Sequence, residues 1–79
     1  MTLSEAALAI VGGADPKSIE RYQEASRRLG RAVAAALLNR DSAALERACQ
    51  IAGTYSALVD AAIRAGVDRD ELEEALGAI

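Results

Sequence analysis

The sequence is 79 residues long, with nine basic and twelve acidic side chains and a formal net charge of −3. It can form one small domain, residues 1–79, whose core buries little apolar area because alanine is the commonest residue and phenylalanine and tryptophan are absent. A single cysteine excludes an intramolecular disulfide, and no apolar run approaches the roughly 18 residues of a membrane span.

A first helix is predicted over residues 2–11. Thr2 and Glu5 have the spacing of a capping box, in which each side chain accepts a hydrogen bond from the backbone of the other residue. The glycine pair 12–13 ends the helix, because glycine favours conformations that a helix does not use.

A second, longer helix is predicted over residues 16–38. Asp15 is a suitable N-cap, and Pro16 suits the first helical position because no backbone N–H is needed there. Apolar or small residues recur at steps of three and four, at Ile19, Tyr22, Ser26, Leu29, Val33 and Ala36. Residues 32–38 contain no polar side chain over almost two helical turns, so this part requires cover on several sides.

A third helix is predicted over residues 42–65, after a connection so short that it must return antiparallel to the second. Its apolar arc is too wide for one partner helix. Gly53 within this helix costs about 1 kcal/mol relative to alanine. Close approach of another helix is the simplest explanation for this glycine, and a helix irregularity is the alternative.

A last helix is predicted over residues 68–78. Asp68 and Glu71 have the spacing of a second capping box, and Val67 and Leu72 occupy the positions of a hydrophobic staple. Its acidic side chains suit the positive end of the helix dipole.

The sequence therefore predicts an all-α fold, a long antiparallel hairpin with short flanking helices that completes a four-helix bundle as a homodimer. The alternative is that the terminal helices cover the apolar faces within one chain. The face expected to bind a second copy or another protein comprises Leu37, Leu38, Ile51, Tyr55, Leu58 and Ala62.

Enzyme chemistry is not expected. Without histidine the chain lacks the commonest general base and nitrogen ligand, so we expect no catalytic residue, cofactor or metal site. Cys49 lies on an apolar helix side and is interpreted as a structural cysteine. The first eleven residues lack the basic start and long apolar run of a signal peptide, which predicts a cytoplasmic protein.

Charge is distributed unevenly, with a net +2 over residues 1–40 and −5 over residues 41–79. A second, charged surface is predicted at Arg27, Arg28, Arg31, Glu71 and Glu74. The favoured function is a non-enzymatic protein-interaction module of a regulatory, inhibitory or assembly type. The alternative is a dimeric nucleic-acid-associated regulator that uses the arginine cluster, although the net negative charge opposes binding to phosphates.

Overall fold

A computed structural model describes residues 2–13 and 15–79. The described part is helical without strands, so the predicted all-α class is confirmed. Its helices are α1 (Leu3–Val11), α2 (Pro16–Leu38), α3 (Ser42–Ala52), α4 (Tyr55–Arg64) and α5 (Arg69–Gly77). No helix in this part is long and apolar enough to cross a membrane.

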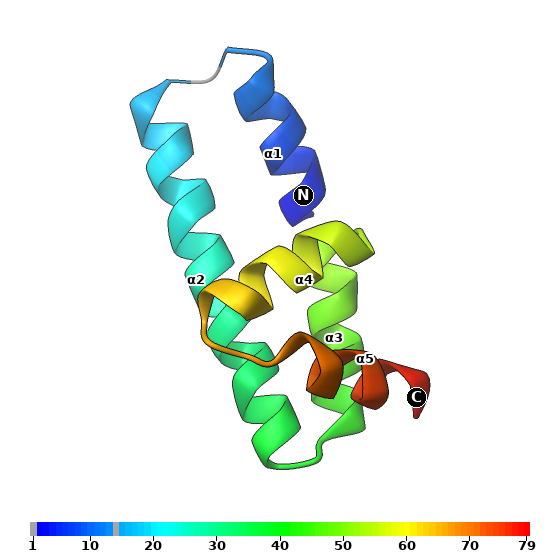
Figure 1. Ribbon diagram of the computed structural model, residues 1–79. Helices are drawn as coiled ribbons and strands as arrows, with labels where there is room; N and C mark the ends of the chain where they lie inside the picture. The colour runs from blue at the N-terminus through cyan, green and yellow to red at the C-terminus, as the bar shows by residue number, and fades with distance from the viewer. Residues whose placement is uncertain (1, 14) are drawn as a thin grey trace.

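The molecule is elongated, with extents of 37 × 18 × 18 Å, and α2 runs along most of its length (Figure 1). α1 lies beside the first half of α2, and α3 returns along the second half. α4 crosses back to α2, and α5 packs at the end where α2 finishes. The first half of α2 therefore has fewer neighbours than the second.

Helix starts are fixed by local side-chain bonds at the predicted caps. The capping box of α1 is complete: the Glu5 N–H donates to Thr2 Oγ1 over 3.2 Å, and the Thr2 N–H donates to Glu5 Oε2 over 3.4 Å. Asp15 accepts from the Ser18 N–H over 2.9 Å. Asp68 caps α5 as predicted, but its Oδ1 accepts from the Asp70 N–H, so the expected box with Glu71 does not form.

The predicted single helix over 42–65 is wrong, because it is divided into α3 and α4. Gly53 ends α3 with a φ of 84°, a left-handed value that glycine adopts without a steric penalty. Thr54 then starts α4, and its Oγ1 accepts from the Ala57 N–H over 3.2 Å. A Cβ on residue 53 would also lie 2.7 Å from Thr2 Oγ1, so the break and the close approach of α1 both require glycine here.

The core lies where α2 meets α3 and α4, and the terminal helices add one buried residue each, Leu3 and Leu72. α2 and α4 approach closely at Gly30, which is buried against Ala61 and Ala65. The buried apolar residues are Leu3, Leu29, Val33, Ala36, Leu45, Ala48, Ala52, Leu58, Val59, Ala61, Ala62 and Leu72. One chain thus builds its own core, although α1 is covered poorly.

Candidate functional site

The structure separates the six residues predicted to form one partner-binding face. Leu58 and Ala62 are buried in the core, with 2% and 0% of their surface exposed, so they cannot contact a partner of the folded chain. Leu37 is half-buried, while Leu38, Ile51 and Tyr55 remain exposed. The division at Gly53 separates Ile51 from the residues of α4, because spacings counted through an unbroken helix do not hold across the turn between α3 and α4. Leu58 and Ala62 are buried because α4 packs against α2.

Leu37 and Leu38 line a groove between the end of α2 and α5. We call it the α2–α5 groove, and its volume is about 920 Å³. Its apolar lining comprises Ala34, Ala36, Leu37, Leu38, Leu45, Val67, Ala75 and Ala78. Leu38 is 85% exposed at this groove. The groove is therefore an apolar surface that the chain itself leaves uncovered.

Carboxylates surround this apolar lining. Asp41, Asp68, Glu71 and Glu74 all line the groove, whereas Arg40 is its single basic residue. Thus Glu71 and Glu74, predicted as part of a separate charged surface, lie in the same groove as Leu37 and Leu38. Sequence reasoning missed this combination, because only the docking of α5 through buried Leu72 brings residues 71 and 74 near the end of α2.

Two of the four carboxylates already have a structural task. Asp41 Oδ1 accepts from the Ala44 N–H over 3.0 Å at the start of α3, and Asp68 Oδ1 accepts from the Asp70 N–H over 2.8 Å. Within residues 2–13 and 15–79, the side chains of Glu71 and Glu74 form no hydrogen bond or ion pair. These two glutamates are consequently free to bind a cation from outside the chain.

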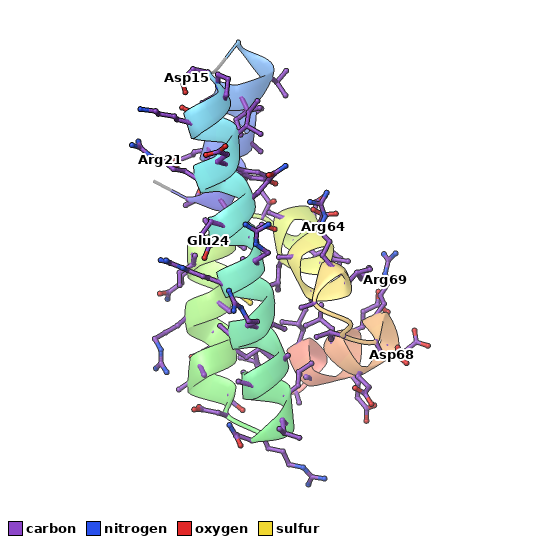
Figure 2. All side chains as sticks on the ribbon, turned by 90° about the vertical axis from the view of Figure 1, so that its left-hand side faces the viewer. Asp15, Arg21, Glu24, Arg64, Asp68 and Arg69 are labelled. Carbon is purple, nitrogen blue, oxygen red and sulfur yellow. The ribbon has the colours of Figure 1, made fainter. Side chains whose placement is uncertain are left out.

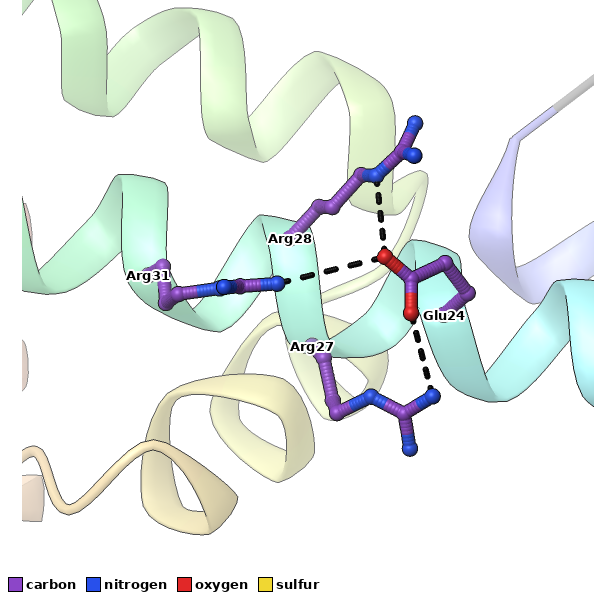
Figure 3. A network of polar contacts seen from close by, with 4 residues as sticks. All are labelled: Glu24, Arg27, Arg28 and Arg31. Atoms are coloured by element: carbon purple, nitrogen blue, oxygen red, sulfur yellow. Dashed lines mark hydrogen bonds and ion pairs between the residues drawn. The ribbon is translucent and has the colours of Figure 1, made fainter.

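The predicted arginine cluster lies on an exposed side of α2, where it surrounds one carboxylate (Figure 3). Glu24 Oε2 accepts from Arg27 over 3.0 Å, and Glu24 Oε1 accepts from Arg28 over 3.1 Å. Arg31 Nη2 lies 3.9 Å from the same Oε1. The hydrogen bonds from Arg27 and Arg28 lower the pKa of the Glu24 carboxyl, which stays ionised and offsets part of the positive charge.

Ile51 lies away from Leu38, in a second groove along the first half of α2. This groove, of about 890 Å³, has Ala25, Leu29, Ala32 and Ile51 as its apolar residues. Its charged residues have mixed signs, and Figure 2 shows two of them, Arg21 and Glu24, along the same helix. Such a mixed rim gives no clear electrostatic preference for one kind of partner.

Tyr55 makes a contact within the chain and joins α4 to α5. Its hydroxyl donates to Glu73 Oε1 over 3.0 Å, and Arg69 Nε donates to the same oxygen over 3.2 Å. The hydrogen bond to Glu73 raises the pKa of Tyr55, because the carboxylate stabilises the protonated hydroxyl. Tyr55 therefore helps hold α5 in place, although it remains exposed.

The outer side of α1 was not predicted as a binding surface. Seven of the nine α1 residues are apolar and one, Glu5, is charged, yet only Leu3 is buried. Leu8 and Val11 are 73% and 85% exposed, and we call these two residues the α1 patch. A sequence signal was present, because the apolar residues of this helix are not confined to one side.

Other chemistry is sparse in the described residues. Cys49 is half-buried, and burial raises the pKa of its thiol, which disfavours the reactive thiolate. No three His, Cys, Asp or Glu side chains of the described part gather in a way that could hold a metal ion. No protein-family model, curated protein or solved structure matches the chain.

Proposed function

We propose that this chain is a non-enzymatic protein-interaction module and that a partner protein binds in the α2–α5 groove. The observation that carries the proposal is the exposure of Leu38 beside an apolar lining formed by two helices. Covering such a surface is favourable by about 25 cal/mol per Å² of apolar area. Helix faces and grooves are common recognition surfaces for partner helices.

Capture by the immobilised chain tests this function. We expect a partner protein from a lysate of the source cells to bind the wild-type chain and to be lost with Leu38→Asn, which keeps the size but removes the apolar side chain. Ile63→Asn is the matched control, since Ile63 is another exposed aliphatic residue and lies outside the groove. A partner retained equally by both variants would show that the groove is not the binding site.

We also propose that the chain self-associates, but through the α1 patch. α1 and the first half of α2 form two antiparallel helices, and two such pairs supply the four helices of a dimeric bundle. A two-fold interface places the same surface of each copy together. The α1 patch suits this arrangement because it is apolar and uncharged, whereas two acidic grooves would repel each other.

Sedimentation equilibrium at micromolar concentration tests self-association. We expect twice the chain mass of 8.2 kDa for the wild type and the monomer mass for Leu8→Asn/Val11→Asn. A folded wild-type monomer would overturn the homodimer and leave the groove unaffected. The alternative role in nucleic-acid binding has weaker support, because Glu24 lies within ion-pair distance of all three clustered arginines.

A further inference from the structure

The α2–α5 groove is negative even before a partner is considered. Four carboxylates and one guanidinium line it, and neither Glu71 nor Glu74 is paired within the part of the chain that the structure describes. Both glutamates are on α5 and three residues apart, which places them as neighbours on one side of the helix. Basic side chains of a binding partner could therefore pair with Glu71 and Glu74, which no other group of the described chain contacts through a hydrogen bond or ion pair.

Two helix ends add to this negative charge. Residues from the final turns of α2 and α5 line the groove, among them Leu37, Leu38 and Ala75. The C-terminus of a helix carries about half a negative elementary charge and is usually complemented by Lys or Arg. Neither α2 nor α5 has a basic residue in its last turn, and Arg40, two residues beyond the end of α2, is the single basic residue that lines the groove.

The apolar lining of the groove sets a second requirement for its binding partner. Four alanines line it beside the larger Leu37 and Leu38: Ala34, Ala36, Ala75 and Ala78. Small side chains allow a helix backbone to approach closely, and leucines offer apolar contact area. An occupant that satisfies both the apolar lining and the acidic rim must itself be apolar on one side and basic along the flank.

We propose that the α2–α5 groove binds an amphipathic helix of a partner protein, with its apolar side on Leu37 and Leu38 and its lysines or arginines beside Glu71 and Glu74. This rests on the proposed function and names the partner's chemistry. A second copy is a poorer occupant. Its exposed basic cluster already surrounds Glu24 on α2, which offsets part of the positive charge that the carboxylates of the groove would attract.

A synthetic peptide tests the proposal directly. The probe is a helical peptide with leucines on one side and lysines along the other, and its matched control carries glutamates in place of the lysines. Binding to the full chain is measured by fluorescence anisotropy at low and high salt. We expect the lysine peptide to bind, the glutamate peptide not to bind, and the affinity to fall as salt screens the charges.

Variants of the chain then locate the binding. Glu71→Gln/Glu74→Gln should weaken the lysine peptide about tenfold, since two rim charges are lost. Glu20→Gln/Glu46→Gln removes the same charge at two exposed glutamates outside the groove and should leave the affinity within about twofold. Leu38→Asn should weaken binding without changing its salt dependence. Circular dichroism confirms that each variant remains helical.

If the two double variants weaken binding of the lysine peptide equally, the peptide is attracted to an acidic protein in general, and the proposal is overturned. A lysine peptide that binds as weakly as the glutamate peptide would also overturn it. So would a solution mass that falls from dimer to monomer with Leu38→Asn, because a second copy would then be the occupant. If the peptide fails while the captured partner still depends on Leu38, the basic chemistry is wrong and the proposed function stands. If the lysine peptide does not bind and the captured partner does not depend on Leu38, the groove is not a binding site.

Discussion

Gly30 of α2 packs directly against the main chain of Ala61 in α4, so closely that a Cβ on residue 30 would overlap the Ala61 carbonyl oxygen. The same Cβ would lie 2.8 Å from the Ala65 Cβ. Backbone atoms cannot move aside as the tip of a long side chain can. The closest part of the α2–α4 interface is therefore determined by the absence of a single methyl group.

We expect Gly30→Ala to lower the free energy of unfolding by about 1–3 kcal/mol, as overpacking of a tight core does. The loss should appear although alanine favours a helix by about 1 kcal/mol over glycine. Urea unfolding followed by circular dichroism measures it. Gly77→Ala is the control, because a Cβ on residue 77 would have no neighbour within 4 Å. Equal stability of Gly30→Ala and the wild type would mean that α2 and α4 separate without cost.

Gly53→Ala tests the division between α3 and α4. The substitution strains a φ of 84° by roughly 1–2 kcal/mol and also places a methyl group 2.7 Å from Thr2 Oγ1. Gly66→Ala is matched to it, since Gly66 has a φ of 87° and open space around it. Urea unfolding should show a larger loss for Gly53→Ala. Identical losses in the free energy of unfolding would indicate that Thr2 at the start of α1 moves aside without an energetic cost.

The helix starts could be predicted from the sequence, because each depends on residues close together in the chain. Thr2, Asp15, Asp41 and Asp68 cap helices through atoms two or three residues away. The break at Gly53 has a local signal as well, a glycine followed by a threonine N-cap, but the apolar pattern continues through it. Periodicity alone therefore favoured one long helix.

The groove could not be predicted in the same way. Its lining combines Leu38 with Glu71, residues brought together only after α4 crosses α2 and Leu72 of α5 enters the core. The sequence placed Leu38 on the partner-binding face and Glu71 on a separate charged surface, and it gave no distance between them. Leu58 and Ala62 illustrate the converse, since a wide apolar arc in sequence became the buried interface of a single chain.

Leu58→Ala and Leu38→Ala distinguish a core residue from a surface residue of the same type. Leu58 is 2% exposed, so its truncation should lower the free energy of unfolding by about 2–5 kcal/mol. Leu38→Ala should change it by less than about 0.5 kcal/mol, as exposed substitutions do. Thermal and urea unfolding measure both variants at a concentration where the wild type's mass is known. A large loss with Leu38→Ala would show that Leu38 is covered in solution.

Ser26→Ala is expected to stabilise the chain. The Ser26 hydroxyl is buried and has no hydrogen-bond partner within the described residues. An unsatisfied buried polar group is unfavourable, and alanine is also the better helix former, so we expect a gain of about 1 kcal/mol in the free energy of unfolding. A comparable loss in urea unfolding would instead show that a bound water satisfies the hydroxyl.

Tyr55 gives the fold a dependence on alkaline pH. Its hydroxyl donates to Glu73 in the folded chain, which raises its pKa above the ordinary value of about 10. Because the protonated form is favoured on folding, this stabilisation is complete below the unfolded pKa and is lost as the pH rises through the folded pKa. In Tyr22→Phe, which leaves Tyr55 as the remaining tyrosine, tyrosinate absorbance should therefore appear at higher pH in the folded chain than in urea.

Glu73→Gln provides the control for this titration. Glutamine keeps an oxygen that can accept the hydrogen bond but removes the negative charge that stabilises the protonated hydroxyl. In the Tyr22→Phe background, Glu73→Gln should shift the folded titration toward that of the unfolded chain, and Tyr55→Phe should abolish the alkaline loss of stability. A folded titration that does not respond to Glu73→Gln would mean that the contact between Tyr55 of α4 and Glu73 of α5 is not maintained in solution.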